Sequence, residues 1–202
     1  MYTKMSEFWD ERFKQKEYVY GIQPNIFFAE TIKQLRPGKL LLPMEGEGRN
    51  AVYAAKLGWK VTAFDYSKEG QRKALELAKE NNVQIDYHIS EATSFIFPKK
   101  TFDAVGLIFS HLPPGSREVL HNGCVQALTS GGIIIAEYFH PDQLGYGSGG
   151  PKQLDMLYDA ALLKNDFSEL IPEVCEEKVV TLNEGPYHQG RASVVRYLGK
   201  KR

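Results

Sequence analysis

Residues 40–65 read LLLPMEGEGRNAVYAAKLGWKVTAFD. Residues 40–42 form a short apolar run, which is typical of a strand that is buried on both faces of a sheet. Gly46 and Gly48 follow, and their missing side chains allow the backbone to approach a ligand closely. Residues 50–55 favour a helix whose first amides would point at that ligand. The stretch therefore predicts a strand, a glycine turn and a helix, the opening unit of a nucleotide-binding α/β sheet.

A second strand is expected at residues 61–64, and it ends in an acid, Asp65. Asp65 follows Gly46 by 19 residues. That distance is close to the spacing of about 20 residues at which a carboxylate grips the hydroxyls of a ribose. A purely structural strand, turn and helix with an exposed aspartate would also contain these glycines. The spacing to Asp65 favours an adenosine-type ligand instead.

Composition narrows the class of protein. The chain has 202 residues, of which 43% are apolar and 25% charged, as expected for one α/β domain with its own core. Basic and acidic residues number 25 each, so the net charge is zero. A general nucleic-acid or membrane-surface binder would need a basic excess. We therefore expect a small-molecule partner, no nucleic acid and no membrane, and a monomer or a homodimer.

Compartment and metal content follow from the apolar runs and the cysteines. The N-terminus has no apolar core of signal-peptide length, and no run approaches the roughly 20 residues of a membrane span. Cys124 and Cys175 lie far apart, and no cluster of His and Cys has metal-ligand spacing. These features predict a cytoplasmic protein with reduced cysteines and no metal.

Strands and helices alternate along the chain, which predicts a parallel sheet covered on both faces. The fold class expected is α/β, a Rossmann-like doubly wound, mostly parallel seven-stranded sheet with a C-terminal antiparallel strand pair. We expect a single domain over 1–202, with an N-terminal helical cap at 1–37 and a core at 38–202. A glycine-rich segment, 141–152, is either a lid or a connector. Further helices are expected at 6–16, 25–35, 67–80, 116–128 and 157–170, and further strands at 83–89, 102–109, 133–138, 175–182 and 192–198.

With these motifs in place, the chain resembles a class I S-adenosylmethionine-dependent methyltransferase over nearly its whole length. Residues 46–50, Gly-Glu-Gly-Arg-Asn, match the first motif of the tellurite-resistance and thiopurine methyltransferase-like branch. Residues 64–67, Phe-Asp-Tyr-Ser, match the second motif, and residues 102–105, Phe-Asp-Ala-Val, match the run into the fourth strand. The N-terminal residues 9–13, Trp-Asp-Glu-Arg-Phe, resemble the same branch, as do the later pairs Tyr-Gly at 20–21 and Pro-Asn at 24–25.

The chain departs from the family pattern at three places. Leu42 stands where the family usually has an acid, and Met44 stands at the first of its glycines. Glu45 is the nearest acid, displaced from the usual place. In the third motif, Glu91 is the nearest substitute for an aspartate that faces the adenine.

The resemblance and the positions together assign the site residues. Asp65 would accept hydrogen bonds from both ribose hydroxyls, and Tyr66 would pack against the adenine. The residues expected to bind the cofactor are Glu45, Gly46, Glu47, Gly48, Asn50, Asp65, Tyr66, Ser67, Glu91, Ala92, Phe109 and Ser110. Those expected on the substrate side are Trp9, Tyr20, His111, Tyr187, His188 and Arg191.

Two of these roles have structural alternatives. His111 is the candidate general base, although a histidine beside two prolines is more often structural. Tyr187, His188 and Arg191 fall in an expected hairpin loop over 183–190 or just beyond it, where simple hairpin closure would also explain them.

The function expected is methyl transfer from S-adenosylmethionine, with S-adenosylhomocysteine as product, to a small acceptor. The resembled branch suggests a thiol or chalcogen species as that acceptor. Soft nucleophiles need little help from a base, and no convincing base motif is evident. One alternative is an NAD(P)-dependent oxidoreductase, because Gly46, Gly48 and Ala51 fit the dinucleotide fingerprint. A second is a non-catalytic adenosine-ligand binding protein on the same fold.

Overall fold

The computed structural model describes the backbone of residues 2–202 and the side chains from residue 6 onward. The helices are α1 (Tyr2–Phe13), α2 (Ile26–Ile32), α3 (Arg49–Lys56), α4 (Lys68–Glu80), α5 (Pro114–Ala127) and α6 (Ala160–Asp166). The strands are β1 (Lys39–Pro43), β2 (Lys60–Asp65), β3 (Asp86–Ile89), β4 (Phe102–Ile108), β5 (Leu128–Phe139), β6 (Leu170–Glu184) and β7 (His188–Lys201). Two short 3-10 helices, η1 (Pro141–Gly145) and η2 (Leu154–Met156), lie between β5 and α6.

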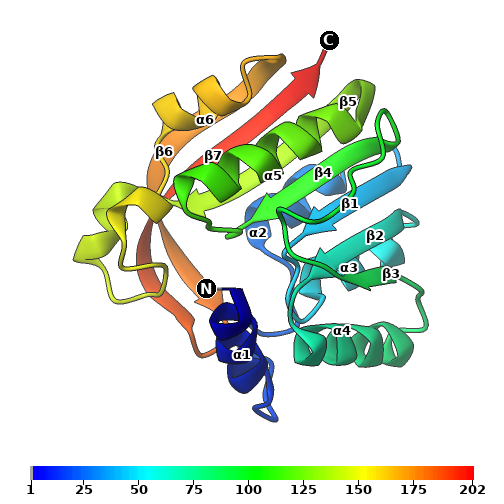
Figure 1. The fold of residues 1–202 in the computed structure, drawn as a ribbon, viewed down its shortest axis with the longest axis vertical. Coiled ribbons are helices and arrows are strands. Elements are labelled where there is room, and N and C mark those ends of the chain that lie inside the picture. Colours follow the sequence, from blue (N-terminus) through cyan, green and yellow to red (C-terminus); the bar gives the residue numbers. More distant parts are fainter. Residues whose placement is uncertain (1) are drawn as a thin grey trace.

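The seven strands form one sheet in the order β3-β2-β1-β4-β5-β7-β6. Strands β1 to β5 pair in parallel, and β7 is antiparallel to both of its neighbours, β5 and β6. Figure 1 shows β7 lying between β5 and β6 at one end of the sheet. The predicted fold class, including the C-terminal antiparallel pair, is confirmed.

Helices cover both faces of the sheet (Figure 1). Strand β1 shows why residues 40–42 in its middle are all apolar. Leu40 and Leu42 pack into the cluster under α2, α3 and α4, whereas Leu41 packs into the cluster under α5 and α6. All three side chains are completely buried. Successive residues of a strand point to opposite faces, so a strand covered on both faces must be apolar at every position.

The C-terminal strands are longer than the sequence pattern predicts. β5 begins at Leu128, whereas the expected strand began at residue 133. The pairing of β5 with β4 shifts its register between Phe102 and Ala104, and this irregularity accommodates the additional residues. β6 begins at Leu170 and tolerates Pro172 because it is an edge strand with an irregular register there. The helix expected at 157–170 is correspondingly shorter.

The hairpin between β6 and β7 is also tighter than predicted. From Val174 onward its register runs without interruption to the pair Glu184 and His188, so only residues 185–187 form the turn. The expected loop over 183–190 is wrong, and His188 and Arg191 belong to β7. Gly185 has a φ of 68°, and a Cβ atom there would lie 2.3 Å from the Gly21 nitrogen. The turn therefore packs directly against the N-terminal segment.

The glycine-rich segment 141–152 is held against β7. Gln143 is buried and accepts a hydrogen bond from the Ser193 nitrogen at 2.9 Å. Its amide nitrogen donates to the Ser148 hydroxyl, which donates in turn to the Arg191 carbonyl at 2.7 Å. These buried hydrogen bonds make the segment a fixed wall next to the hairpin.

The N-terminal segment is fastened to α4. Helix α1 begins at Tyr2 and ends at Phe13, earlier than the expected 6–16. Asp10 accepts hydrogen bonds from the Ser67 hydroxyl and the Glu69 nitrogen, at 2.5 and 3.2 Å. Figure 1 shows that this places α1 beside α4 and next to the β6–β7 hairpin. Within the described residues, no helix is both long and apolar enough to cross a membrane.

Candidate active site

A cavity of about 490 Å³ opens at the carboxyl ends of β1, β2 and β4, beneath α1 and beside the hairpin. Its volume is within the range of about 300–1,000 Å³ that is usual for small-molecule sites. The predicted site residues in its wall are Trp9, Tyr20, Glu45, Gly46, Glu47, Asn50, Asp65, Tyr66, Phe109, His111 and His188. Those outside the wall are Gly48, Ser67, Glu91, Ala92, Ser110, Tyr187 and Arg191.

The glycine loop takes a left-handed backbone conformation at every second residue. The φ angles are 53° at Met44, 60° at Gly46 and 85° at Gly48. Met44 therefore adopts the conformation for which the family pattern uses its first glycine, at a cost of about 1–2 kcal/mol. A Cβ atom on Gly46 would lie 3.3 Å from the Phe13 ring. The loop thus keeps a narrow space between its backbone and α1.

Glu45 is partly buried against the start of α3. One carboxylate oxygen accepts hydrogen bonds from the Asn50 and Ala51 nitrogens, both at 2.8 Å, and the other accepts from the Asn50 side chain. Burial raises the pKa of Glu45 to about 7, against the opposing effect of these hydrogen bonds. Both oxygens already have partners within the chain, so Glu45 shapes the loop by capping the helix.

Glu47 lines the cavity, but its carboxylate serves the N-terminal segment. It forms a buried ion pair with Lys73 and accepts a hydrogen bond from the Val19 nitrogen at 2.8 Å. Lys73 donates to the carbonyls of Gln15 and Glu17, at 2.9 and 2.7 Å. The pair therefore fixes residues 15–19 over the glycine loop, and this arrangement argues against the expected role of Glu47 in binding a cofactor.

Asp65 ends β2 at the floor of the cavity. Its two oxygens accept hydrogen bonds from the Gly46 and Ser67 nitrogens, at 3.1 and 2.9 Å. Burial raises the pKa of Asp65 to about 6, although the backbone hydrogen bonds act in the opposite direction. An ionised carboxylate has about four acceptor sites, so Asp65 keeps capacity for the two hydroxyls of a ribose. These free acceptor sites fit the ribose hydroxyls in the adenosine part of S-adenosylmethionine.

The remaining predicted cofactor residues are not part of the cavity wall. Ser67 caps α4 through the Gly70 nitrogen and binds Asp10. Gly48 lies against Ala74 of α4, and Ala92 is part of the core on the α5 side. In this arrangement Ser67, Gly48 and Ala92 position the neighbouring elements and do not themselves line the cavity.

Aromatic rings make the opposite wall. Phe109 and Phe139 stack with their ring centroids 4.5 Å apart, and His188 lies 4.4 Å from Tyr20. Phe109 has a φ of 52°, an uncommon conformation for a non-glycine residue that is concentrated at functional sites. Phe139 was not predicted, because nothing in its local sequence marks it as different from other strand phenylalanines.

His111 lines the cavity, but its hydrogen bonds argue against the predicted role of general base. Nδ1 lies 2.6 Å from the Met156 carbonyl, and Nε2 accepts the Phe139 amide at 3.1 Å. Burial lowers the pKa of His111 to about 3. Both ring nitrogens are therefore committed to the backbone, and no lone pair remains for a substrate proton.

His188 differs from His111 because a carboxylate, and not a backbone group, lies against its Nδ1. Its Nδ1 lies 3.4 Å from Glu184 Oε2, and Glu184 is held in turn by Arg49 at 2.8 Å and by Asn25 at 3.0 Å. Glu184 is not among the site residues predicted from the sequence. With the correct turn length it could have been found, because it lies directly opposite His188 on the neighbouring strand.

Arg12 is a second cavity residue that is not among the predicted site residues. Its guanidinium lies 4.5 Å above the Phe8 ring, 5.1 Å above Trp9 and 4.9 Å above Tyr187. Among the side chains that the structure describes, its hydrogen-bond partner is the Tyr20 hydroxyl at 3.5 Å, and it has no carboxylate partner. An anionic group of a ligand could therefore pair with it.

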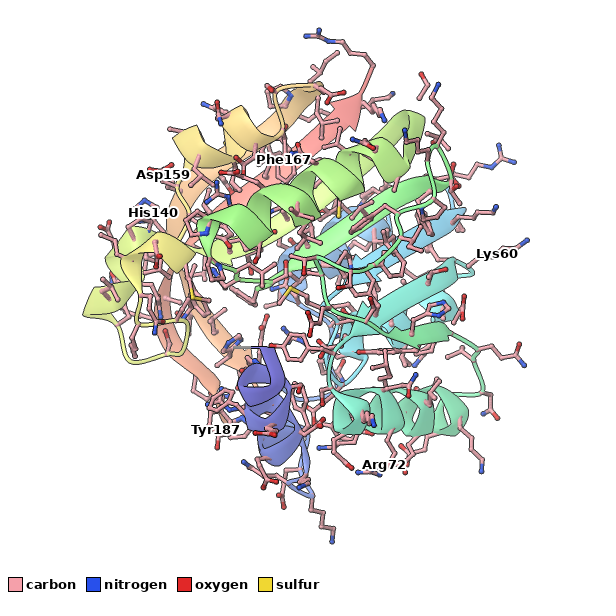
Figure 2. The ribbon with its side chains drawn as sticks, viewed as in Figure 1. Lys60, Arg72, His140, Asp159, Phe167 and Tyr187 are labelled. Carbon is pink, nitrogen blue, oxygen red and sulfur yellow. The ribbon has the colours of Figure 1, made fainter. Side chains whose placement is uncertain are left out.

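Tyr187 itself lies at the hairpin tip beside α1, as Figure 2 shows, and its hydroxyl accepts a hydrogen bond from Gln15 at 3.2 Å. Arg191 points toward Tyr146, with its guanidinium 5.9 Å from that ring. Tyr187 thus closes the hairpin onto α1, and Arg191 packs on the glycine-rich segment outside the cavity wall.

The comparison with protein families supports the predicted class of protein, a methyltransferase. Residues 44–132, a little under half of the chain, match the sequence profile of a methyltransferase domain. The match begins at the glycine loop and includes Asp65 and the end of β4. No curated protein sequence matches the chain significantly.

Solved structures share the fold along most of the chain. One is a protein from work on the conversion of a disulfide bond into a thioacetal group during echinomycin biosynthesis, with a TM-score of 0.77 and 16% identity, over 98% of this chain and 92% of that one. Another is TehB from Haemophilus influenzae, with a TM-score of 0.73 and 15% identity, over 98% and 67%. A third is an S-adenosylmethionine-dependent methyltransferase from Clostridium acetobutylicum, with a TM-score of 0.66 and 11% identity, over 99% and 98%. The chain therefore has the Rossmann-like fold that these solved structures share.

Proposed function

We propose that this protein transfers the methyl group of S-adenosylmethionine to a small-molecule acceptor. The observation that carries the proposal is Asp65, a buried carboxylate at the end of β2 that is tied to the glycine loop through the Gly46 nitrogen. It faces a cavity on a fold shared with methyltransferases, in a chain whose residues 44–132 match a methyltransferase domain.

Each part of the cavity would have a distinct task. Asp65 would accept hydrogen bonds from the ribose hydroxyls, and Tyr66 would pack beside the adenine. S-adenosylmethionine would supply an electrophilic methyl group on a positively charged sulfur. The faces of Trp9 and Tyr20 would stabilise that positive charge. Arg12 would pair with the carboxylate at the methionine end.

The aromatic wall would hold the acceptor and exclude water. Alignment of the acceptor with the methyl group and the leaving sulfur is the main contribution that a protein makes to such a transfer. Thiol or chalcogen acceptors, and membership of the tellurite-resistance and thiopurine methyltransferase-like branch, are proposed from the sequence motifs. A cytoplasmic location, a monomeric or homodimeric state and the absence of a metal and of nucleic-acid partners remain parts of the same proposal.

Calorimetric titration with S-adenosylmethionine, S-adenosylhomocysteine and NADH tests the class of ligand. We expect micromolar binding of the first two, about −8 kcal/mol, and no binding of NADH. Binding of NADH alone would overturn the proposal in favour of an oxidoreductase. Binding of the first two without turnover of any acceptor would favour an adenosine-ligand sensor.

Asp65→Ala tests the assignment of the ribose site. Losing two charge-assisted hydrogen bonds, each contributing about 1.5–3 kcal/mol, should weaken S-adenosylmethionine binding at least a hundredfold. Asp86→Asn is the matched control, because Asp86 is exposed on the edge strand β3, away from the cavity. Wild-type affinity in Asp65→Ala would remove Asp65 from the site.

A further inference from the structure

The buried pair of Glu184 and His188 forms the last rung of the β6–β7 ladder, and it has a chemical use within the proposed function. Their side chains are only 5% and 6% exposed. Burial alone would raise the pKa of Glu184, but His188 and Arg49 lower it to about 2. Glu184 is therefore ionised near neutral pH and can only accept hydrogen bonds.

An ionised Glu184 decides which nitrogen of His188 carries the proton. Because Glu184 Oε2 faces Nδ1 at 3.4 Å, the hydrogen of a neutral imidazole belongs on Nδ1. Nε2 is then the unprotonated nitrogen, with a free lone pair. Among the described residues, Nε2 has no hydrogen-bond partner, and the His188 ring lines the cavity.

The glycine-rich segment keeps the edge of this ring clear. Gly149 has a φ of 114°, and a Cβ atom there would lie 2.8 Å from His188 Cδ2 and 3.3 Å from Nε2. Any other residue at position 149 would press on Cδ2 and Nε2 of this ring. The absence of a side chain therefore preserves access to Nε2.

Two other buried histidines show that this arrangement is specific to His188. His111 uses both nitrogens on backbone groups. His121 places Nδ1 2.8 Å from Asp166 and Nε2 2.9 Å from the Tyr138 hydroxyl. Only at His188 is a carboxylate on Nδ1 combined with an unpaired Nε2, as judged from residues 6–202.

We propose that His188 is the base that takes a proton from the methyl acceptor, so the acceptor carries an ionisable hydrogen on nitrogen, oxygen or sulfur. His188 Nε2 takes that hydrogen as a proton, and the electron pair of its bond is left on the acceptor atom. That atom bonds to the methyl carbon, and the bond from carbon to sulfur breaks with its electron pair on sulfur. The products are the methylated acceptor, neutral S-adenosylhomocysteine and a protonated His188 that Glu184 stabilises until the proton returns to water.

The groups around His188 suit this role and suggest the shape of the acceptor. Burial lowers the pKa of His188, Glu184 raises it, and the positive charges of Arg49 and Arg12 lower it, so the imidazole is neutral near pH 7. His111, which also faces His188, is neutral as well.

Aromatic rings surround the His188 ring, with centroids at 4.4 Å for Tyr20, 4.8 Å for Phe109 and 5.2 Å for Phe139. The geometry therefore favours a flat, largely apolar acceptor such as a phenol, an aromatic amine or a thiol.

Nitrogen NMR of the imidazoles tests the proposal without knowledge of the acceptor. We expect His188 at pH 7.5, in the complex with S-adenosylhomocysteine, to show a hydrogen on Nδ1 and an unprotonated Nε2. His188→Gln assigns the signals by their loss. Glu184→Gln should shift the hydrogen toward Nε2, whereas Glu176→Gln, an exposed glutamate on the same strand, should not. A hydrogen on Nε2 in the wild type would overturn the proposal.

A kinetic comparison separates a base from a structural histidine. Phenol is almost un-ionised at pH 8, whereas thiophenol is largely ionised and needs no base. His188→Gln should lower kcat for phenol by about 10²–10⁴-fold and should change kcat for thiophenol far less. Equal losses with both acceptors would overturn the base assignment. Failure of S-adenosylhomocysteine to bind at all would instead be a failure of the proposed function, which the titration detects separately.

Discussion

The two halves of the cavity are built in different ways. The cofactor half, defined here as the glycine loop and the end of β2 (residues 44–67), uses backbone amides and two carboxylates from one stretch of chain. The acceptor half, defined as Tyr20, Phe109, Phe139 and His188, takes its side chains from segments spread over the whole sequence. Local sequence can therefore encode the first half, whereas the second exists only after the chain has folded.

One buried ion pair joins the two halves, and breaking it should have the largest effect on stability. Arg49 at the start of α3 holds Glu184 of the hairpin at 2.8 Å, with side chains 8% and 5% exposed. Arg49→Met leaves the Glu184 charge buried without its main partner, which should cost about 3–5 kcal/mol of unfolding free energy. Urea denaturation followed by circular dichroism measures the loss.

Arg72→Met is the matched control for Arg49→Met. Arg72 pairs with Glu69 and Glu76 on the surface of α4, where its side chain is 49% exposed, and Figure 2 shows it pointing away from the molecule. Exposed pairs contribute about 0–1 kcal/mol. Equal losses of unfolding free energy in the two variants would mean that the two halves of the cavity do not depend on the pair of Arg49 and Glu184 for their stability.

A glycine substitution tests how tightly the cofactor half packs. Gly48 and Gly58 both have left-handed backbones, with φ of 85° and 90°. A Cβ atom on Gly48 would lie 2.5 Å from Ala74 Cβ, whereas on Gly58 the nearest atom would be 3.9 Å away. Gly58→Ala should cost only the backbone strain, about 1–2 kcal/mol. Gly48→Ala should cost a further 1–3 kcal/mol, roughly, from overpacking. Thermal denaturation of both variants would show similar losses if α4 could move aside.

The affinity for S-adenosylmethionine should depend on pH through Asp65. The ribose hydroxyls need an ionised acceptor, and the pKa of Asp65 is about 6 in the free protein. Affinity should be constant above pH 7 and fall below pH 6, by up to about tenfold per pH unit. Calorimetry across pH measures this, with Asp86→Asn expected to follow the wild type. A flat profile would show that Asp65 does not contact the ligand in its charged form.

The raised pKa of Asp65 makes the stability of the free protein change with pH in the opposite direction to the ligand affinity. The ordinary pKa of an aspartate is 3.8, and burial raises the pKa of Asp65 in the folded protein to about 6. Its contribution to stability is therefore fully present below pH 3.8 and is lost as the pH rises through 6. Ligand binding should offset this loss, so the stabilisation by S-adenosylmethionine should grow between pH 5 and 7.

The smallest effect is expected at the rim of the acceptor half. Tyr187→Phe removes the exposed hydrogen bond to Gln15 and keeps the ring beneath Arg12. The loss of stability should be below about 1 kcal/mol. Tyr187→Ala also removes the cation–π contact, worth about 0.5–1 kcal/mol at an exposed site. Neither variant should change S-adenosylmethionine affinity more than a few-fold, and a large change would place Tyr187 within the cofactor half.

The sequence predicts the cofactor half well because its geometry is local. The apolar run of β1, the glycines and the spacing to Asp65 predict which backbone segments meet at the sheet edge. Even the departure at Met44 keeps the left-handed conformation that the loop requires. The parallel sheet follows from the alternation of strands and helices along the chain, and its antiparallel end follows from two final strands that no helix separates.

Local pattern fails where partners come from distant segments. Glu47 has the sequence position of a ligand-binding residue. Its partner, however, is Lys73 of helix α4, and the ion pair between them fixes residues 15–19 over the glycine loop. His111 stands at the expected sheet edge, but backbone groups from residues 139 and 156 occupy both of its nitrogens.

The sequence by itself determined the fold class, the glycine loop and the carboxylate at the end of β2, since strand burial and backbone conformation depend on neighbouring residues. Only the tertiary structure decided which histidine has a free nitrogen. His188 owes its arrangement to Glu184 across the hairpin, and Glu184 is held by Arg49 of α3. Hydrogen-bond capacity is a property of what surrounds a side chain, and those surroundings are set when distant segments pack together.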